Sequence, residues 1–291
     1  MTILEAIKKA AAALEQAAVP DSRLDAEYLL AHVLSVGRMS MLLNGQTELS
    51  SDHQRAFDAL ITRRTAREPL QYIIGLQSFM GLSFHVDKHV LIPRPETEIL
   101  CEQAIHWLQQ KKLSAPRVLD LCTGSGALAV AIAHTLPDAQ VFATDISASA
   151  LAMAQRNAKA NNVLVKFAQG DFLEPLKGLT FDCIVCNPPY IPTGVCKTLQ
   201  PEVMMEPENA LDGGNDGLVF YKRLALESHA FLTPGGALFC EVGFDQAATV
   251  EQIFTPVFEL TTMIDDLCHI PRIVTAVSSK RLPGGNDVRQ V

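Results

Sequence analysis

The tetrapeptide Asn187-Pro188-Pro189-Tyr190 combines groups suited to holding a planar, conjugated NH2 group. The Asn187 carboxamide oxygen and the Pro188 carbonyl can each accept one N–H of such a group, and Tyr190 offers a flat face for stacking. Prolines have fixed φ angles and no N–H, so the segment is stiff and cannot join a neighbouring strand. Taken alone, it also fits a proline-rich turn that ends a strand, and its surroundings must decide between the two interpretations.

A glycine-containing turn lies upstream, at Cys122-Thr123-Gly124-Ser125-Gly126. It stands between the apolar run 117–121 and a helical run, as in nucleotide-binding strand–turn–helix units, although ordinary turns share this pattern. Asp145 ends the next apolar stretch, 21 residues after Gly124, a spacing typical of a carboxylate that binds ribose hydroxyls. The turn has neither the glycine spacing of a dinucleotide fingerprint nor the Lys-Ser/Thr of a P-loop. A nucleoside without pyrophosphate, such as S-adenosylmethionine, fits it better.

Asp171 and Phe172 follow a third apolar stretch. Asp171 can accept a hydrogen bond from an adenine amino group and Phe172 can cover the ring, while a helix cap and a core aromatic explain them equally well. Ligands of an open parallel sheet bind beyond the carboxyl ends of its strands. We therefore expect residues 120–126, 145, 170–172 and 187–190 to meet at one edge.

The elements that position these residues alternate from Arg117 onward, which predicts an α/β fold with a mostly parallel sheet. Strands are expected at 117–121, 140–145, 164–169, 181–186, 236–241, 258–264 and 272–278, and helices at 97–111, 125–136, 147–161, 217–231 and 245–254. No helical pattern separates the last two strands, so we expect them to form an antiparallel pair.

Residues 1–75 predict a separate small helical bundle. Thr2 and Glu5 have the spacing of a capping box, and apolar residues follow at helical intervals. The bundle carries no glycine-rich loop, so it is interpreted either as a unit that recognises a macromolecular partner or as a structural cap. Residues 76–92 alternate between apolar and polar, which predicts a linking hairpin. Residues 281–291 are expected to form a flexible tail.

Composition narrows the class of protein. The chain has 291 residues and a net charge of −8, which argues against a protein that wraps nucleic acid. No stretch reaches the ~20 apolar residues of a membrane span, and the N-terminus lacks the pattern of a secretory signal. Seven cysteines without framework spacing suggest reduced thiols and a cytoplasmic setting. Cys183 and Cys186 fall inside an apolar strand, so we interpret them as buried cysteines and predict no metal site.

Over nearly its whole length the chain resembles the release-factor glutamine methyltransferases of the HemK/PrmC family. The matching segments are Arg67–Tyr72, Phe79–Leu82 with Phe84, Val90–Glu98, Asp120–Gly126, Asn187–Tyr190, Glu206–Pro207, and Ala210–Gly214 with Asp216–Leu218. The resemblance implies a seven-stranded, Rossmann-like methyltransferase fold with an antiparallel last strand, which we expect at residues 93–280. Residues 1–75 are expected to form a helical substrate-recognition domain. It implies S-adenosylmethionine as the methyl donor. The implied acceptor is the glutamine of the Gly-Gly-Gln loop in class I peptide-chain release factors.

The resemblance also implies roles for individual residues. Cys122–Gly126 would lie against the methionine moiety, Asp145 would bind ribose and Phe172 would contact adenine. Asn187–Tyr190 would hold the substrate amide. The chain departs from the family at Cys122, where glycine is frequent. It departs again at 267–272, where the family has a small glycine-containing turn.

Other interpretations remain open at this stage. An exocyclic base amine is also conjugated, so an adenine or cytosine methyltransferase acting on DNA or RNA would use a similar tetrapeptide. A glutamine methyltransferase acting on a large-subunit ribosomal protein is closer, although that family typically departs from the segment Pro93–Glu98. A catalytically silent module that only docks on the release factor would have little reason to keep both motifs. Three further charged residues, Asp182, Glu206 and Asp216, are expected to have surface roles.

Overall fold

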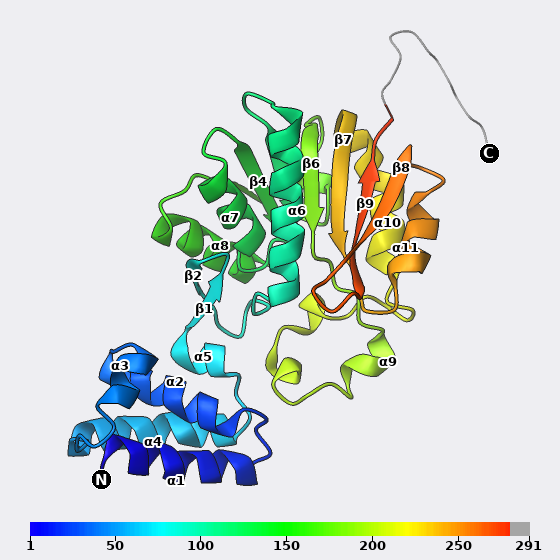
Figure 1. Cartoon of the computed structure of the whole chain (residues 1–291). Coiled ribbons are helices and arrows are strands. Elements are labelled where there is room, and N and C mark those ends of the chain that lie inside the picture. The colour runs from blue at the N-terminus through cyan, green and yellow to red at the C-terminus, as the bar shows by residue number, and fades with distance from the viewer. Residues whose placement is uncertain (280–291) are drawn as a thin grey trace. The chain divides into compact units, whose positions relative to one another are not determined.

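The computed structural model describes residues 1–279 and divides into two compact units (Figure 1). The first unit contains Met1–Leu76 together with Leu199–Met205, and the second contains Gln77–Thr198 and the described residues from Glu206 onward. The sequence analysis had placed residues 199–205 with the methyltransferase domain. The tail expected at 281–291 lies outside the described residues.

The second unit is built on a seven-stranded sheet with the order β5-β4-β3-β6-β7-β9-β8. Its strands are β3 Arg117–Leu121, β4 Gln140–Asp145, β5 Lys166–Gln169, β6 Phe181–Cys186, β7 Leu232–Glu241, β8 Leu260–Asp265 and β9 Pro271–Val277. The neighbouring strands β5, β4, β3, β6 and β7 pair in parallel. Strand β9 pairs antiparallel with both β7 and β8. The expected α/β fold and its antiparallel final pair are confirmed.

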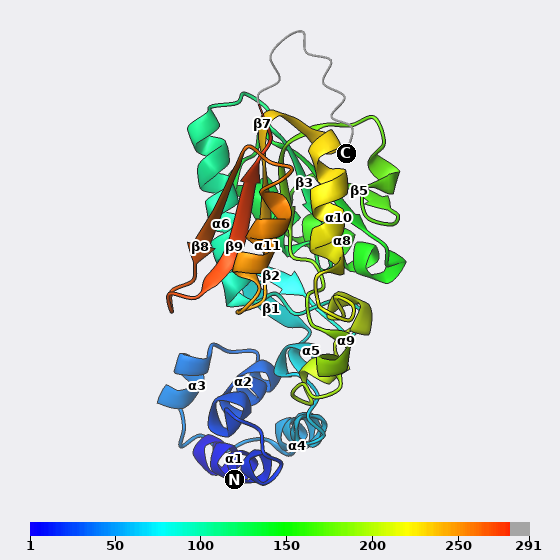
Figure 2. The same ribbon diagram turned by 90° about the vertical axis from the view of Figure 1, so that its right-hand side faces the viewer.

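Helices cover both faces of this sheet (Figures 1 and 2). They are α6 Pro95–Lys111, α7 Ala127–Thr135, α8 Ala148–Ala160, α10 Val219–Glu227 and α11 Ala247–Phe254. The short helix α9 Thr193–Cys196 lies in the connection between β6 and α10, and short 3₁₀ turns occur at Glu174–Leu176, Glu208–Ala210 and Ser228–Phe231. Because side chains alternate along a strand, Cys183 and Val185 of β6 pack into the core with α6 and α7. Ile184 and Cys186 pack into the opposite core with α10 and α11.

Two short connections complete the second unit. Strands β1 (Leu76–Phe79) and β2 (Leu82–His85) form a two-stranded sheet, which confirms the expected hairpin. Between β8 and β9, the Asp266 carboxylate accepts hydrogen bonds from the N–H groups of Cys268 (2.8 Å) and Ile270 (3.0 Å). His269 takes a left-handed φ of 60°. The Asp266 side chain thus organises the turn between β8 and β9.

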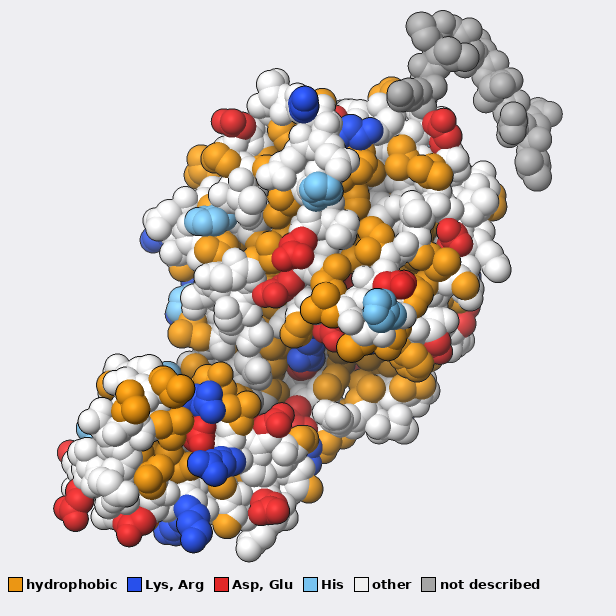
Figure 3. All heavy atoms as spheres, viewed as in Figure 1, with side chains coloured by type: hydrophobic (Ala, Val, Ile, Leu, Met, Phe, Trp, Pro, Cys, Tyr) orange, Lys and Arg blue, Asp and Glu red, His pale blue; other side chains and the backbone are white. Residues whose placement is uncertain are grey.

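The helices, the cysteines and the charged side chains bear on the class of protein. Within residues 1–279, no helix combines the length and apolar composition needed to cross a membrane. All seven cysteines are free, and Cys183 and Cys186 are buried in β6 as expected. On the face drawn in Figure 3, basic side chains are interspersed with acidic ones.

The first unit is a helical bundle, as predicted. Its helices are α1 Ile3–Gln16, α2 Ser22–Leu34, α3 Arg38–Leu43, α4 Ser51–Thr65 and α5 Leu70–Ile74, and Val203–Met205 forms a 3₁₀ turn. The Thr2 hydroxyl accepts from the Glu5 N–H (3.3 Å) and the Glu5 carboxylate accepts from the Thr2 N–H (2.8 Å), which confirms the capping box. Leu14, Leu29 and Phe57 lie fully buried in the core of the bundle.

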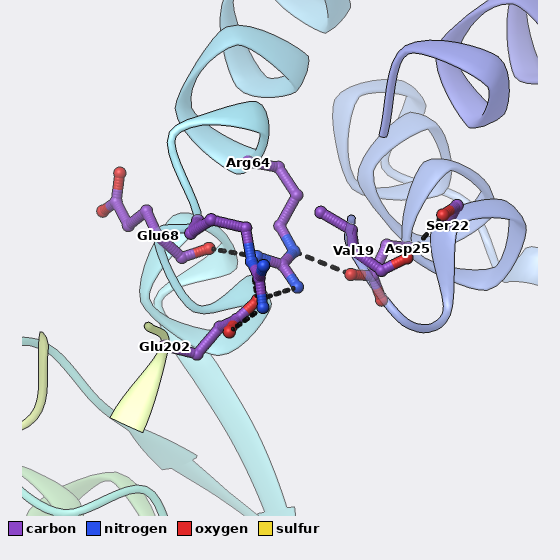
Figure 4. Close-up of polar contacts among 7 residues, drawn as sticks. Val19, Ser22, Asp25, Arg64, Glu68 and Glu202 are labelled. Atoms are coloured by element: carbon purple, nitrogen blue, oxygen red, sulfur yellow. Dashed lines mark hydrogen bonds and ion pairs between the residues drawn. The ribbon is translucent and has the colours of Figure 1, made fainter. Parts of the chain in front are cut away.

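A buried arginine attaches residues 199–205 to this bundle (Figure 4). Arg64 of α4 donates to Asp25 of α2 (2.7 Å) and to Glu202 (2.8 Å), and its side chain is only 5% exposed. Arg67 donates to both carboxylate oxygens of Glu202, each at 2.6 Å. Burial opposes ionisation of Glu202, but hydrogen bonds from Arg67 and Arg64 outweigh it and lower the pKa of Glu202 to about 2. Arg64 therefore links carboxylates from two distant parts of the chain, and Arg67 supplies the second positive charge.

We predict that Arg64→Ala lowers the free energy of unfolding by about 3–5 kcal/mol, because it leaves the buried Asp25 carboxylate without its cation. The matched control is Arg55→Ala on the same helix. Arg55 and its partner Asp52 are both exposed, so the control should change stability by less than about 1 kcal/mol. Urea unfolding of the full chain, followed by circular dichroism, measures both. Equal effects of the two substitutions would contradict the prediction.

Candidate active site

The carboxyl ends of four strands lie level at one edge of the sheet. Leu121 of β3 pairs with Thr144 of β4 and with Cys186 of β6, and Cys186 pairs with Cys240 of β7. Each strand therefore presents its following residue at the same level. These following residues are Cys122, Asp145, Asn187 and Glu241.

A cavity opens at this edge and brings most of the sequence-predicted residues together. Cys122, Gly124, Asp145, Asp171, Phe172, Asn187 and Pro189 line it. Thr123, Ser125, Gly126, Pro188 and Tyr190 are not among its lining residues. Thr123, Ser125 and Pro188 are buried. The expectation of a shared edge is met, and the remaining residues of each motif lie within two positions in the chain of a residue that lines the cavity.

Asp145 is held in place by backbone N–H groups. Its two carboxylate oxygens accept from the N–H of Gly124 (2.9 Å) and from the N–H of Ser147 (2.9 Å). Burial raises the pKa of Asp145, although these hydrogen bonds act in the opposite direction. Each oxygen keeps further acceptor capacity, so the carboxylate can accept from ligand hydroxyls in the cavity.

The glycine-containing turn is organised by a buried carboxylate below it. One oxygen of Asp120 accepts from the Thr123 hydroxyl and from the Ala129 N–H (3.0 Å). Burial raises the pKa of Asp120 to about 7. Gly124 has a φ of 55°, and a Cβ there would meet open space beside the cavity. At Gly126 a Cβ would stand 2.9 Å from the Ala154 Cβ, so this glycine permits close packing of α8.

Asp171 and Phe172 are both in contact with one arginine. Arg223 of α10 donates to both oxygens of Asp171, at 2.9 and 3.1 Å. Its guanidinium carbon also lies 4.4 Å from the centroid of the Phe172 ring. Phe172 is 4% exposed and packs near Phe220. The structure thus pairs Asp171 with a cation that the sequence analysis did not anticipate.

Asn187 is connected to two buried side chains. Its Nδ2 lies 3.0 Å from Thr97 Oγ1 of α6. The Thr97 hydroxyl in turn donates to Glu241 Oε2 at the end of β7, at 2.6 Å. Thr97 is 5% exposed and Glu241 is 2% exposed. The carboxamide of Asn187 is therefore anchored on its nitrogen side and lines the cavity.

The loop after Asn187 is also tightly packed. The Tyr190 carbonyl accepts from Gln246 Nε2 at 2.9 Å. Burial raises the pKa of Tyr190, so its hydroxyl stays protonated at neutral pH. A Cβ at Gly213 would lie 2.7 Å from Tyr190 Cα and 2.9 Å from the Pro189 carbonyl oxygen. Glycine at position 213 thus lets its segment lie directly against the backbone of the tetrapeptide.

Besides Arg223, the sequence predictions missed the roles of Glu241, Thr97 and Glu206. Glu241 follows an apolar strand as Asp145 and Asn187 do, and this signal could have identified it. Thr97 was interpreted only as a possible helix start. The surface role expected for Glu206 is wrong, because its side chain is 1% exposed, pairs with Arg94 and accepts from the Ile92 N–H at 3.0 Å.

The other two charged residues behave differently. Asp216 is exposed and pairs with Lys222, in agreement with its expected surface role. Asp182 is half-buried and accepts from the Arg117 N–H (2.9 Å) and the Thr233 hydroxyl (3.0 Å). It therefore joins the amino-terminal ends of β3 and β6 to the start of β7, at the opposite edge of the sheet from the cavity.

Comparisons with known proteins agree with this geometry. The PrmC N-terminal domain family matches residues 5–75, and the methyltransferase small domain family matches residues 102–231. The release factor glutamine methyltransferase of Geobacter sulfurreducens is 44% identical over 243 residues, covering 83% of this chain and 84% of that protein. That of Moorella thermoacetica is 43% identical over 255 residues, covering 87% and 89%.

The solved structures support the fold. A methyltransferase from Pyrococcus furiosus superposes with a TM-score of 0.53 at 18% identity, covering 76% of this chain and 98% of that chain. The two relatives named above match this chain over most of its length and over most of their own length. This chain belongs to the release factor glutamine methyltransferase family.

Proposed function

We propose that this methyltransferase transfers a methyl group from S-adenosylmethionine to a glutamine side-chain nitrogen. The acceptor is the glutamine of the Gly-Gly-Gln loop in class I peptide-chain release factors. The observation that carries the proposal is the anchored Asn187 carboxamide at the wall of the cavity. The names of the relatives support the choice of acceptor.

The residues of the cavity fit S-adenosylmethionine. Asp145, fixed by two N–H groups, would accept from the ribose hydroxyls. Phe172 would contact adenine, and Asp171 would add acceptor capacity beside it despite its pairing with Arg223. Because a Cβ at Gly124 would project into open space, the turn Cys122–Gly126 leaves room for the methionine moiety. When bound, this cofactor supplies an electrophilic methyl group.

The tetrapeptide would orient and activate the acceptor. An amide nitrogen is a weak nucleophile because its lone pair is delocalised into the carbonyl. The Asn187 oxygen and the Pro188 carbonyl would accept its two N–H groups, fix the amide plane and stabilise positive charge that develops on nitrogen. Tyr190 would stack on the amide, and Pro189 would close the cavity wall. The chain needs no base before transfer, since the proton becomes acidic only as the nitrogen–carbon bond forms.

The first unit is proposed to recognise the release factor outside its Gly-Gly-Gln loop. Contacts remote from the reacting atoms can be expressed in the transition state, so they can raise kcat as well as affinity. The net charge of −8 and the interspersed charges visible in Figure 3 favour a protein partner over nucleic acid. A release-factor substrate would place the enzyme in the cytoplasm, in agreement with its free cysteines.

The first test is a parallel assay with labelled S-adenosylmethionine. We expect methylation of full-length release factor, weak methylation of a short Gly-Gly-Gln peptide, and none of DNA or of large-subunit ribosomal protein. Asn187→Ala should reduce kcat about 100-fold or more, the effect of losing one polar contact to developing charge. Calorimetry should show that this variant still binds the cofactor. Preferred methylation of ribosomal protein or DNA would replace the proposed acceptor.

The second test concerns the cofactor. Asp145→Ala should weaken S-adenosylmethionine binding at least about tenfold, because charge-assisted hydrogen bonds contribute roughly 1.5–3 kcal/mol each. Asp171→Ala should weaken it less, because Arg223 already engages both oxygens of that carboxylate. Isothermal titration calorimetry measures both dissociation constants. The opposite order of effects would show that Asp145 does not hold the ribose.

The third test concerns the packing behind the tetrapeptide. Gly213→Ala should lower kcat at least about tenfold, because the added Cβ would displace the backbone of Pro189 and Tyr190. The control is Gly194→Ala in α9, where a Cβ meets nothing within 4 Å and activity should be unchanged. Steady-state methylation of release factor measures both variants. A fully active Gly213→Ala would show that the position of the loop is not critical.

A further inference from the structure

The segment Pro93–Glu98 fixes the start of α6 from three sides. Arg94 pairs with the buried Glu206. Glu98 accepts from the Met80 N–H, in the turn of the hairpin, at 2.6 Å. Thr97 lies between Asn187 and Glu241. The proposed activity uses none of these residues directly, yet the first two hold the Thr97 hydroxyl at a defined place beside the tetrapeptide.

Counting protons determines the direction of the hydrogen bonds through Thr97. A hydroxyl has one proton to donate, and an ionised carboxylate can only accept. When Glu241 is ionised, Thr97 must donate to it, so the Thr97 oxygen can only accept from Asn187. The group of Asn187 that faces Thr97 is then its NH2, and the carboxamide oxygen is left for the cavity. An amide rotated by 180° would place two acceptors against each other.

We propose that Thr97 and Glu241 are positioning residues that hold the Asn187 carboxamide with its oxygen toward the acceptor amide. The proposal rests on the function proposed above for Asn187. It assigns a role to the buried carboxylate of Glu241, which is connected to the substrate through Thr97 and Asn187 by three hydrogen bonds. A carboxylate in such an apolar place is costly unless its partners compensate for the lost water.

The hydrogen bonds that join Asn187, Thr97 and Glu241 also make activity depend on pH. Burial raises the pKa of Glu241 to about 7, and hydrogen bonds from Thr97 and Asn187 act against that rise. Below this pH Glu241 carries a proton and can donate to Thr97, which frees the Thr97 proton for the Asn187 oxygen. The carboxamide can then rotate and present its NH2 to the cavity, where it cannot accept an N–H from the substrate. Activity should therefore rise with pH through about 7.

Glu241 is the group in its surroundings whose pKa lies near 7. Glu96 of α6 raises the pKa of Glu241, and Arg272 of β9 lowers it. The other titratable neighbours have pKa values raised by burial and stay protonated at neutral pH; they are Cys186 of β6, Tyr190 after it, Tyr221 of α10 and Cys240 of β7. The N-cap of α11, Gln246, is uncharged. Asp120 also has a pKa of about 7, so the assignment requires a variant of Glu241 itself.

The test measures kcat, KM and cofactor affinity between pH 5.5 and 9 with full-length release factor. Thr97→Val removes the hydroxyl and keeps the shape of the side chain. It should lower kcat at least tenfold, with the cofactor dissociation constant within about twofold and no rise in activity near pH 7. Thr97→Ser restores a hydroxyl and should recover both kcat and the pH profile.

Two further variants complete the design. Glu241→Gln should remove the rise near pH 7 and lower kcat at pH 8.5 at least fivefold, while a rise caused by Asp120 would persist. Thr275→Val removes another buried hydroxyl, which donates to the Thr262 hydroxyl between β9 and β8, and should leave kcat unchanged. Thermal melting shows whether each variant is folded. If Thr97→Val does not fold, the profiles of Thr97→Ser and Glu241→Gln decide.

The outcomes separate this inference from the function on which it rests. Suppose that Asn187→Ala is inactive. A wild-type kcat in Thr97→Val, or an unchanged pH profile in Glu241→Gln, would then overturn the positioning role. An active Asn187→Ala would instead remove the proposed role of Asn187. A loss in Thr97→Val that appears only in KM or in cofactor binding would also overturn the proposal, because orientation of Asn187 acts on the transition state.

Discussion

The parallel hydrogen bonding of β4, β3, β6 and β7 is the constraint on which the site depends. Its register fixes Thr144, Leu121, Cys186 and Cys240 at one level. The residues after them then leave the sheet together, although up to 119 positions separate them in the chain (122 to 241). A slip of one residue in any strand would turn its last side chain to the other face. The residues proposed to contact the cofactor and those proposed to hold the substrate amide are therefore positioned by the same backbone pairing.

Two residues that follow β3 and β5 are also conformationally strained. Cys122 and Phe172 take left-handed φ values of 61° and 53°, which cost a residue other than glycine roughly 1–2 kcal/mol. Both residues line the cavity. A left-handed φ is a conformation that glycine adopts without this cost. Residues in such strained conformations persist where the surrounding structure holds them in place, and they cluster at ligand-binding sites.

Most of the fold followed from local patterns in the sequence. Apolar runs in the sequence predicted the strands of the sheet. The residues at the ends of these runs predicted that Asp145 and Asn187 lie at one edge of it. The partners of these residues did not follow, because Thr97 and Glu241 lie 90 and 54 positions from Asn187 and no local pattern links them. Glu206 was expected at the surface because a lone glutamate usually lies there, and only the tertiary contact with Arg94 explains its burial. The pairing of Asp171 with Arg223 was hidden for the same reason.

The inclusion of Leu199–Met205 in the first unit has a consequence for how the protein is made. The contact between Arg64 and Glu202 closes a loop of the chain, because the two residues are 138 positions apart in the sequence. This separation is long compared with the separations between contacting residues of the bundle helices. During synthesis the helices leave the ribosome first, but this part of their packing waits for residues that follow six strands. Until then Arg64 neutralises Asp25 alone. Completion of the small amino-terminal unit is therefore a late event in the folding of the nascent chain.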